Sequence, residues 1–335
     1  MVFFVCTLVA SILIVRLGYL MLTKADYYGV KAKELHERER SIKAERGKIL
    51  DRNGNVLAGN VSVSTISVIH SQVKEPEKVI SVLSKELDFK EAEIRKKVEK
   101  NSSREKIKSN VEKEISDRIR AYKLAGVTVD EDYKRYYEYG TLASKVLGFT
   151  GGDNQGIVGL EVSYESLLKG LDGSILTMAT AGGVEIRNGA EDRKEPIAGW
   201  DLTTTLDLNV MEYATQVANK LLEQKQAKTV EIIIMNPQNG EIYAMVNAPE
   251  FNLNEPYKLN YETSGEDKKK KKQDLLNKMW RNQCINDTYE PGSTFKVVTA
   301  TAALENNVVT LDSRFSCPGF RIVDDRKIRC HKTTG

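Results

Sequence analysis

The stretch ERGKILDRNGNVLAGN, Glu45 to Asn60, reads as two strands joined by a tight turn. Asn53-Gly54 supplies the positive φ angles that a two-residue hairpin turn needs. The segment VSVSTISVI, Val61 to Ile69, then alternates apolar and polar residues, which is typical of a half-buried strand. A second hairpin is predicted in TVEIIIMNPQNGEIYAMVNAP, Thr229 to Pro249, around a turn at 236–240. Helical segments are expected between these hairpins.

The length and charge of the chain exclude some classes of function. At 335 residues the chain is long for one domain and suits two or three. It is 41% hydrophobic and 29% charged, ordinary values for a chain that buries a core. Its net charge is only +3, and no basic stripe is interleaved with aromatic residues. The sequence therefore predicts no binding to nucleic acid.

The N-terminal stretch from Val2 to Leu22 carries a single charge, Arg16. At a rise of ~1.5 Å per residue it is long enough to cross the ~30 Å hydrocarbon layer of a bilayer. Arg16 lies near one end, where a long side chain can reach the headgroups. A signal peptide would show a basic segment and a small-residue cleavage site, and neither is evident. We expect a single membrane anchor over residues 1–23 rather than a signal peptide or a buried helix.

The segments that follow are expected to form a mixed domain. Residues 24–44 are charged and predict a helical stalk. Residues 75–124 are helical in pattern and strongly charged, with a break at 101–103. Residues 127–140 return to strand-like alternation, and a glycine-rich loop then leads into a helix near Leu160. That loop contains neither G-x-G-x-x-G nor G-K-[ST], so the sequence does not predict nucleotide binding.

A new domain is expected from residue 199 onward. Asp207 can cap a helix whose apolar stripe consists of Val210, Ala214, Val217 and Leu221. A polar stretch later in this domain carries five consecutive lysines, Lys268 to Lys272. Such a run is most often solvated, and contact with an anionic wall polymer or lipid headgroup is the sharper alternative.

Ser-x-x-Lys occurs four times in the chain: at Ser71/Lys74, Ser103/Lys106, Ser166/Lys169 and Ser293/Lys296. The first two pairs lie in solvated, charged segments, and Ser166 lies inside a predicted surface helix. Ser293 differs because Pro291-Gly292 precedes it and an apolar helix follows it. We expect that helix to be buried, so that its first turn opens from the core toward a cleft.

A serine at such a position can act as a nucleophile. Its hydroxyl feels the positive end of the helix dipole, and nearby backbone N–H groups can stabilise an oxyanion. Lys296 lies on the same face and can accept a proton if desolvation depresses its pKa. None of the three histidines, His36, His70 and His331, lies in an obvious catalytic setting, so a Ser-His-Asp triad is not expected. The local pattern suits a plain helix cap at Ser293 equally well.

The chain contains four cysteines: Cys6, Cys284, Cys317 and Cys330. Cys317 and Cys330 bracket CPGFRIVDDRKIRC, in which Asp324-Asp325 can form a hairpin turn. A disulfide between them would suit an oxidising compartment, and two unrelated thiols remain the alternative. A metal site with His331 would lack a C-x-x-C knuckle, so no metal is expected.

Taken together, several segments resemble the class B penicillin-binding proteins, the membrane-anchored D,D-transpeptidases of bacterial wall synthesis. The resembling segments cover nearly the whole chain and follow one another in the family's order. One departure is Glu138, which stands where the family commonly has proline. The segments that carry it are RGKILDRNGNVLA (46–58), KRYYEYGTLASKVLGFTG (134–151), GIVGLEVSYESLLKGLDG (156–173), GWDLTTTLD (199–207), NPQNGEIYAMVNAPEFNLN (236–254) and RNQCINDTYEPGSTFK (281–296).

By this resemblance Ser293 is the acylated nucleophile and Lys296 the general base that handles its proton. The implied reaction attacks the D-Ala–D-Ala bond of a stem peptide, and β-lactams acylate the same serine. The implied chemistry requires no metal or cofactor. Cys317 and Cys330 resemble a cysteine pair of some division- and sporulation-type members.

The resemblance also implies an α+β multidomain architecture. A helical stalk at 24–44 follows the anchor, a pedestal or dimerisation domain occupies 45–198, and residues 199–335 begin a transpeptidase domain. The family's Ser-x-Asn and Lys-Thr-Gly boxes are not found, and KTTG at 332–335 is interpreted as coincidence. The chain is therefore expected to stop within the transpeptidase domain and to be inactive alone. A non-catalytic scaffold that recruits wall-synthesis partners is the alternative.

The implied partners are the lipid bilayer, peptidoglycan stem peptides and their lipid-linked precursor, a polytopic glycosyltransferase and other wall-synthesis membrane proteins. The family places its main body on the extracytoplasmic side of a single membrane span. Lys24, Lys31 and Lys33 follow the span, however, and the positive-inside tendency would then favour a cytoplasmic body. A basic tail preceding this chain would remove the conflict.

Overall fold

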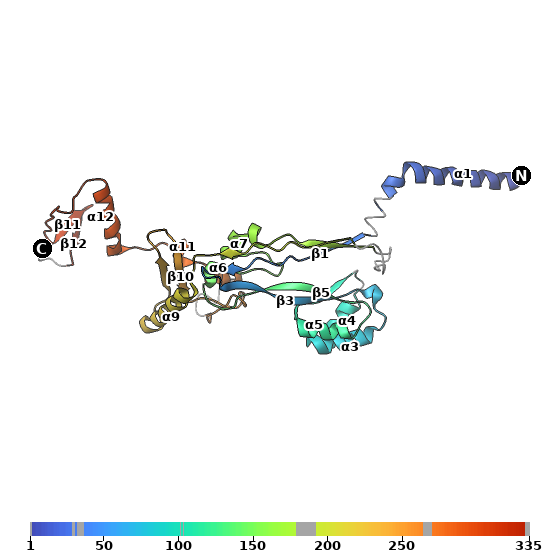
Figure 1. Cartoon of the computed structure of the whole chain (residues 1–335), viewed down its shortest axis with the longest axis horizontal. Helices are drawn as coiled ribbons and strands as arrows, with labels where there is room; N and C mark the ends of the chain where they lie inside the picture. The colour runs from blue at the N-terminus through green and yellow to red at the C-terminus, as the bar shows by residue number, and fades with distance from the viewer. Residues whose placement is uncertain are drawn as a thin grey trace. The chain divides into compact units, whose positions relative to one another are not determined.

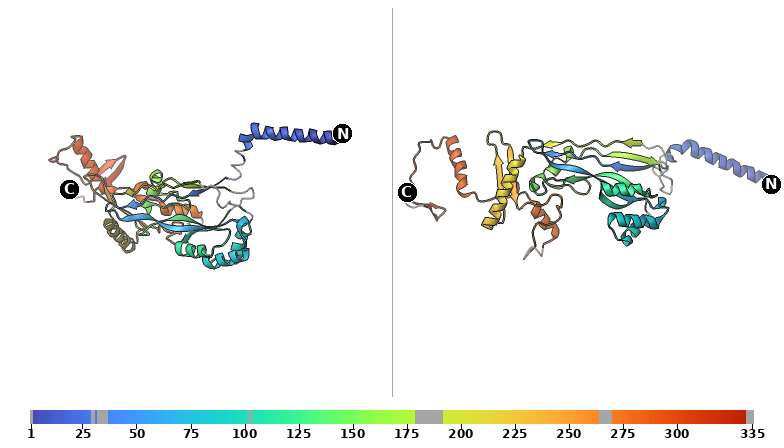
Figure 2. Two further views of the ribbon diagram at one scale, coloured as in Figure 1. Left: turned by 45° about the vertical axis from the view of Figure 1, so that its right-hand side comes forward. Right: turned by 60° about the horizontal axis from the view of Figure 1, so that its bottom comes forward.

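The computed structural model describes residues 2–28, 31, 37–100, 102, 104–178, 192–263 and 270–331. Contacts divide the chain into two units, Met1–Asn286 and Asp287–Gly335. Figures 1 and 2 show the elements of each. His36, Ser103 and the KTTG stretch at 332–335 lie outside the described residues, as do the first two lysines of the run at 268–272.

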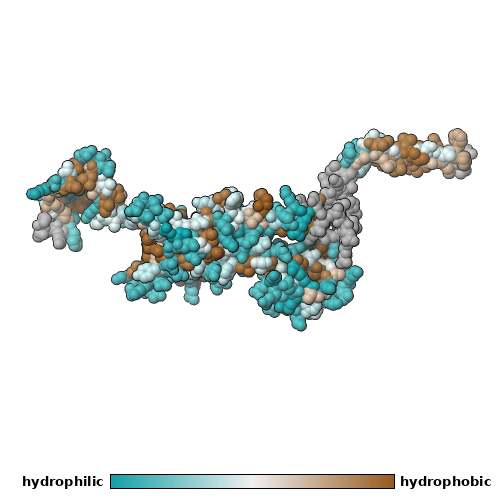
Figure 3. All heavy atoms as spheres, viewed as in Figure 1, coloured by the Kyte–Doolittle hydropathy of each residue, from teal (hydrophilic) through white to brown (hydrophobic). Residues whose placement is uncertain are grey.

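The predicted anchor is a helix, α1, spanning Val2–Thr23. Its side chains are mostly apolar and exposed, as Figure 3 shows, and the stretch Phe3–Thr23 is long and apolar enough to cross a membrane. Tyr27 and Tyr28 follow the helix with their rings 5.2 Å apart, and the ammonium of Lys31 lies 4.7 Å from the ring centroid of Tyr27. Aromatic and basic side chains of this kind are common at membrane–water interfaces.

The first sheet of the pedestal contains β1 (Glu37–Ile42), β6 (Gly173–Met178) and β7 (Asp192–Lys194), all antiparallel. β1 pairs with β6 from Glu37↔Met178 to Ile42↔Gly173. The helical stalk predicted for 24–44 is therefore wrong over Glu37–Ile42. Pairing with a strand more than a hundred residues away overrode the local helical pattern, as tertiary context commonly does.

The second sheet is built on β3 (Val56–Val68), the strand predicted from the alternating pattern. β2 (Ile49–Leu50) pairs with β3 through the predicted hairpin, and Gly54 has a φ of 88°. β5 (Val127–Tyr136) pairs antiparallel with β3 from Gly59↔Tyr136 to Val68↔Val127. β8 (Leu202–Thr203) adds a parallel edge to β2. The predicted hairpin within residues 45–60 and the predicted strand at 61–69 are therefore confirmed.

Three helices pack against the C-terminal part of β3, and one further strand pairs with it. The helices are α3 (Pro76–Leu87), α4 (Glu91–Val98) and α5 (Lys113–Ala121), and a 3₁₀ turn, η1 (His70–Gln72), leads into them. The helical prediction for 75–124 is wrong over β4 (Glu105–Glu112), which pairs with β3. Ile107 and Val111 are buried on one face of β4, an alternation that suits a strand. The buried residues of this core include Ile66, Val68, Val79, Ile80, Leu83, Leu87, Ile94, Val98 and Ile119.

Three short helices follow β5: α6 (Ser144–Leu147), α7 (Gly159–Ser163) and α8 (Glu165–Leu168). They lie close together because the backbone of Gly148 approaches the Val158 carbonyl group. A Cβ atom at Gly148 would lie 1.8 Å from the Val158 oxygen, and its φ is 73°. Only glycine adopts this conformation at so close a contact without strain.

We predict that Gly148→Ala prevents this region from folding. A backbone overlap of that size costs at least ~3 kcal/mol, because neither chain segment can retreat without breaking its packing. Gly152→Ala is the matched control, since nothing lies within 4 Å of the added Cβ. Yield of folded protein and thermal unfolding by circular dichroism distinguish the two. Equal stability of the two variants would contradict this close approach.

The next part of the chain begins with α9 (Leu208–Lys225), and the predicted cap is confirmed. The Asp207 carboxylate accepts hydrogen bonds from the backbone N–H groups of Asn209 and Val210. The second predicted hairpin is also confirmed, as β9 (Val230–Met235) and β10 (Ile242–Ala248) pair antiparallel. α9 packs on this hairpin, placing Met211, Ala214 and Ala218 in the core.

α10 (Lys272–Trp280) and α11 (Gln283–Asn286) complete the first unit. The core at this end combines residues from the pedestal motifs and from the second hairpin. Its members include Ile49, Leu57, Tyr137, Leu147, Phe149, Leu168, Met211, Val246, Phe251, Met279 and Trp280. Phe149 and Trp280 meet edge to face with ring centroids 4.9 Å apart. The expected pedestal and the start of the expected second domain therefore share one core.

The second unit contains η3 (Gly292–Phe295), α12 (Lys296–Glu305) and a two-stranded sheet of β11 (Phe320–Val323) and β12 (Arg326–Arg329). The predicted turn Asp324-Asp325 joins these strands, with φ angles of 48° and 61°. Two consecutive positive φ angles are the geometry of a type I′ hairpin turn.

Candidate functional site

Ser293 lies in the 3₁₀ turn η3, immediately before α12, and Lys296 is the first residue of α12. The Lys296 backbone N–H donates to the Ser293 carbonyl oxygen. The Thr294 hydroxyl donates to the Pro291 carbonyl oxygen at 2.6 Å, which steadies the turn. The expected placement of serine and lysine one turn apart at the start of a helix is therefore present.

The helix-cap alternative for Ser293 concerns the start of η3 and of α12. Pro291 is the cap residue of η3 and Phe295 that of α12, and neither end has a side-chain cap. Ser293 thus makes no capping hydrogen bond to either element. The role of Ser293 as a nucleophile stays a prediction.

The predicted burial of the helix after Ser293 is wrong for the described chain. Val297 is 72% exposed and Val298 is 54% exposed, and no residue of α12 is buried. The pattern is apolar as expected, but none of the described segments packs over it. An apolar pattern predicts that a helix face can be buried, but burial requires a second helix or sheet that packs against that face. The desolvation that would activate Lys296 is consequently not provided by the described residues.

The segment that leads toward Ser293 begins at a polar joint that the sequence did not predict. Asn247, at the end of β10, is fully buried. Its side-chain oxygen accepts hydrogen bonds from the backbone N–H groups of Gln283, at 2.8 Å, and Cys284, at 3.1 Å. Two donors on one amide fix the start of α11.

A partly buried carboxylate at the same joint, that of Glu250, bonds to the pedestal. Glu250 accepts a hydrogen bond from the Ser144 hydroxyl and another from the Asn247 N–H group at 2.9 Å. Burial raises the pKa of Glu250, while the Ser144 hydrogen bond and the nearby Lys145 charge act in the opposite direction. Ser144 and Lys145 both belong to α6 of the pedestal, so this joint connects the pedestal to the hairpin before the serine.

Two of the motifs identified in the sequence meet in a buried ion pair. The Arg46 guanidinium donates to the Glu161 carboxylate at 2.6 Å, and both side chains have no exposed area. Arg46 also donates to Glu165 at 2.7 Å and to the Asn154 carbonyl oxygen at 2.9 Å. The carboxylate and carbonyl partners together fill the planar fork of the guanidinium.

A second arginine completes this buried cluster. Arg135 donates to the other oxygen of Glu161 at 2.7 Å and to the Gly47 carbonyl oxygen at 2.8 Å. The Tyr137 hydroxyl donates to the same Glu161 oxygen at 3.1 Å. Burial and the adjacent Glu161 charge raise the pKa of Tyr137, so it remains a donor. Glu161, from the motif at 156–173, therefore bonds both to Arg46 from the motif at 46–58 and to Arg135 from the motif at 134–151.

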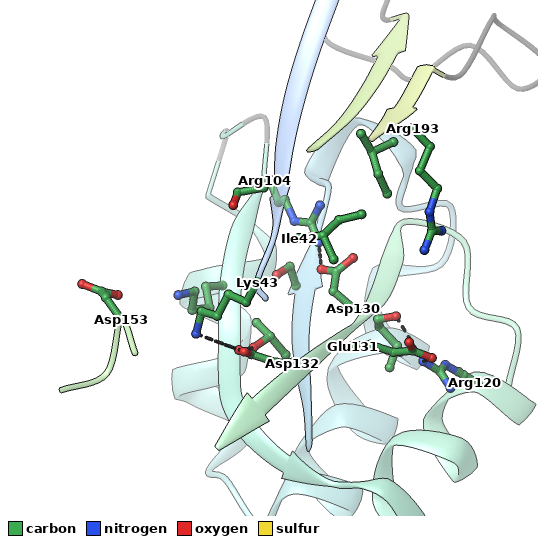
Figure 4. A pocket seen from close by; sticks show the side chains of 15 residues that line it. Ile42, Lys43, Arg104, Arg120, Asp130, Glu131, Asp132, Asp153 and Arg193 are labelled. Carbon is green, nitrogen blue, oxygen red and sulfur yellow. Dashed lines mark hydrogen bonds and ion pairs between the residues drawn. The ribbon is translucent and has the colours of Figure 1, made fainter. Parts of the chain in front are cut away.

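A cavity of about 590 Å³ lies between the two sheets of the pedestal, as Figure 4 shows. The Lys43 ammonium crosses it to the Asp132 carboxylate at 3.0 Å, and Arg104 pairs with Asp130. These opposite charges already pair with each other, so we interpret the cavity as part of the packing between the two sheets and not as a ligand site. Other charged residues that line it are Lys106, Arg120, Glu131, Asp153 and Arg193.

Cys317 and Cys330 flank the β11–β12 hairpin, and their sulfur atoms lie 3.0 Å apart as free thiols. The Cys330 N–H group donates to the Gly319 carbonyl oxygen at 2.9 Å, which holds the ends of the hairpin together. A hydrogen bond between the thiols lowers the pKa of Cys317 and raises that of Cys330. The hairpin therefore brings the two cysteines together, and their disulfide remains a prediction.

We predict that Cys317 and Cys330 form a disulfide under oxidising conditions, because the folded hairpin already holds the sulfurs in contact. Thiol counting on the denatured protein should find two of the four cysteines masked before reduction and none masked afterwards. Cys317→Ser should leave no thiol masked. Four reactive thiols in the unreduced protein would contradict the pairing.

Two of the other three Ser-x-x-Lys serines lie in described elements of the pedestal. Ser71 lies in the 3₁₀ turn η1, and Ser166 lies exposed in α8. Ser103 lies outside the described residues. Within the described ranges, no group of three or more His, Cys, Asp and Glu side chains could hold a metal ion.

Two family models match the chain. The penicillin-binding protein dimerisation domain matches residues 41–204. The penicillin-binding protein transpeptidase domain matches residues 230–335, which contain Ser293 and Lys296.

Curated proteins of similar sequence carry names from wall synthesis and sporulation. Stage V sporulation protein D of Bacillus subtilis is 35% identical over 324 residues, covering 96% of this chain and 48% of that protein. The probable peptidoglycan D,D-transpeptidase PenA of Neisseria meningitidis is 28% identical over 289 residues, covering 85% of this chain and 47% of that protein. The chain thus spans about half the length of these relatives.

Solved structures share the fold. The complex of penicillin-binding protein PBP2 with MreC from Helicobacter pylori matches with a TM-score of 0.65 and 26% identity, over 89% of this chain and 58% of that one. A peptidoglycan synthetase from Bifidobacterium adolescentis matches with a TM-score of 0.61 at 23% identity, over 89% of this chain and 56% of that one. The latter likeness supports the fold alone.

Proposed function

The chain belongs to the class B penicillin-binding proteins, and we propose that it is the anchor, dimerisation domain and first part of the transpeptidase domain of a peptidoglycan D,D-transpeptidase. One observation carries this proposal. Ser293 and Lys296 stand one turn apart inside the segment that matches the transpeptidase domain, and Ser293 caps neither adjoining helix.

The reaction we propose is acyl transfer through Ser293. The Ser293 oxygen attacks the carbonyl carbon of the penultimate D-Ala, and its proton passes to the Lys296 amine. The peptide bond to the terminal D-Ala then breaks, and the departing amine takes a proton. An amine of a second stem peptide attacks the resulting ester, which forms the cross-link and returns the hydroxyl to Ser293. A β-lactam opens on the same serine and remains attached as an ester.

Lys296 can act as a base only when it is unprotonated. Its side chain is exposed in the described chain, so the described residues do not desolvate it. We therefore propose that the 335 residues alone do not acylate, consistent with the absence of Ser-x-Asn and Lys-Thr-Gly from the sequence.

We also propose that α1 crosses the membrane once and that the main body lies on the extracytoplasmic side, where stem peptides are found. The Helicobacter pylori relative was solved in a complex with MreC. By analogy, the pedestal of this chain would bind wall-synthesis membrane proteins, including a polytopic glycosyltransferase. The lipid-linked precursor would reach the cross-linking site through that partner.

A labelling experiment tests the proposed function. A protein that extends this chain through a complete transpeptidase domain should bind a fluorescent penicillin covalently and should release D-Ala from a D-Ala–D-Ala peptide. The 335-residue chain should show neither activity. Absence of both from the extended protein would favour the scaffold alternative, in which the dimerisation domain recruits partners without catalysis.

A further inference from the structure

A second cavity, of about 170 Å³, lies where β4 and β5 of the pedestal meet two loops, at 150–154 and 253–257. Its volume is several times the ~30 Å³ share of one water molecule in the liquid. It is smaller than the ~300–1,000 Å³ of pockets that hold drug-sized ligands. The cavity therefore suits one small unit of a ligand, such as a single sugar ring.

Asn154 is the residue of this cavity that points to a ligand. It lines the cavity and is only 8% exposed. Its backbone is engaged, because its N–H group donates to the Gly151 carbonyl oxygen and its own carbonyl oxygen accepts from Arg46. Its side-chain amide forms no hydrogen bond with another described residue. A nearly buried amide without a partner is unfavourable, so a further hydrogen-bonding group is expected in this cavity.

A second amide lines the same cavity from β4. Asn110 lies between Lys108 and Val111, where the pairing of β4 with β3 shifts register. Such irregularities re-aim a side chain out of the regular strand pattern. Asn110 has a left-handed φ of 56°, and Asn154 has one of 60°, a conformation that asparagine tolerates better than most residues. The Asn110 amide also forms no hydrogen bond with another described residue, so the cavity offers two amides that can donate and accept.

Tyr257 adds a fixed aromatic ring to the lining of the cavity. Its ring centroid lies 5.6 Å from that of Phe149 and 5.7 Å from that of Trp280, both in edge-to-face contacts. Tyr257 nevertheless remains 49% exposed. A ring that packing already holds in place loses little conformational freedom when a ligand packs against it.

The charges around the cavity favour an uncharged ligand. None of its lining residues is acidic, and the basic ones are Lys134 and Arg135. Arg135 is paired with Glu161 at 2.7 Å, and Lys134 is exposed, where water and salt screen its charge. The Asn254 amide is occupied on both sides by the Tyr137 backbone, so it does not contribute to recognition.

We propose that this cavity binds an uncharged N-acetylhexosamine unit of a wall glycan. The Tyr257 ring packs against the C–H face of the sugar, and the amides of Asn110 and Asn154 bind its hydroxyl and acetamido groups. A peptide suits the site less, because extended peptides are bound mainly through backbone hydrogen bonds at a strand edge. The wall as the source of the sugar rests on the proposed function, but binding requires neither Ser293 nor acylation.

Fluorescence anisotropy with labelled chitotetraose, a neutral oligomer of N-acetylglucosamine, tests this site. The full chain would be held in phosphatidylcholine nanodiscs. Asn154→Gly should raise the apparent Kd about tenfold, the effect of losing two neutral hydrogen bonds. Glycine adopts a left-handed φ freely, so the loop should keep its backbone and its hydrogen bond to Arg46. Circular dichroism checks that the variant is folded.

Asn307→Gly is the matched control. Asn307 is also a left-handed asparagine, with a φ of 55°, but it lies in the second unit and outside the cavity. Its replacement should change the apparent Kd less than about twofold. Tyr257→Leu should weaken binding about fivefold through loss of the ring, whereas Tyr257→Phe should leave binding unchanged. This pair tests the site independently of Asn154.

The same Kd for Asn154→Gly and the parent chain, or no binding of chitotetraose, would overturn the proposal. Asn154-dependent binding of a labelled stem peptide in place of the sugar would also overturn it. A fall in affinity for chitotetraose at higher salt would contradict recognition of an uncharged group. Penicillin labelling of the extended protein, measured in parallel, reports on the proposed function separately.

Discussion

Ser293→Ala should abolish covalent labelling of the extended protein by a fluorescent penicillin. The acyl–enzyme ester needs the Ser293 oxygen, and the adjacent Thr294 hydroxyl is engaged with the Pro291 carbonyl oxygen. Loss of a nucleophile typically lowers the rate of acyl transfer by at least about a thousandfold, so no labelled band should remain after a long incubation. Gel fluorescence of the denatured protein measures the result.

Ser166→Ala is the matched control for this prediction. Ser166 has the same spacing to a lysine, Lys169, but lies exposed in α8 of the pedestal. Its replacement should leave labelling unchanged. Lys296→Met should reduce the labelling rate while leaving Ser293 in place, because proton removal would then depend on water. Persistent labelling of the Ser293 variant would refute the assignment of the nucleophile.

Glu161→Ala should destabilise the dimerisation domain by about 3–5 kcal/mol. The substitution removes the shared carboxylate, so Arg135 loses its carboxylate partner and Arg46 keeps only the one from Glu165. It also leaves the Tyr137 hydroxyl without its acceptor. For a domain of this size the midpoint of thermal unfolding should fall by roughly 10 °C, measured by circular dichroism.

Glu77→Ala provides the contrast. Glu77 pairs with Arg95 through two short contacts of 2.6 and 2.7 Å, but both side chains are exposed on the helices α3 and α4. Exposed ion pairs contribute little because water and salt screen them. The unfolding midpoint of this variant should therefore stay close to that of the parent. A similar fall in both variants would show that burial does not decide the strength of the Glu161 cluster.

Local pattern predicted several elements correctly. The alternation of 61–69, the hairpin around Asn53-Gly54 and the Asp207 cap each depend on neighbouring residues and were predicted correctly. The turn itself differs from the prediction, because it spans residues 51–55 and only Gly54 has a positive φ. The strands β1 and β4 were missed because their charged segments carry no strong local strand signal. Both are held by partners distant in the sequence, β6 for β1 and β3 for β4.

The sequence alone determined the residue types that can carry the chemistry. The Ser293–Lys296 spacing, the Pro-Gly turn before it and the ordered motifs upstream were all readable without a structure, because they are local. In the structure Ser293 is the cap residue of neither η3 nor α12, and the apolar face of α12 is exposed in the described chain.

Only the tertiary structure decided which distant residues act together. Arg46 and Glu161 belong to separate motifs, and their shared burial follows from packing around one core. Asn247 and Glu250 were not identified from the sequence, yet they join the pedestal to the segment before Ser293. The physical reason is that a buried charge or amide is stable only beside its partner, and the fold alone places that partner.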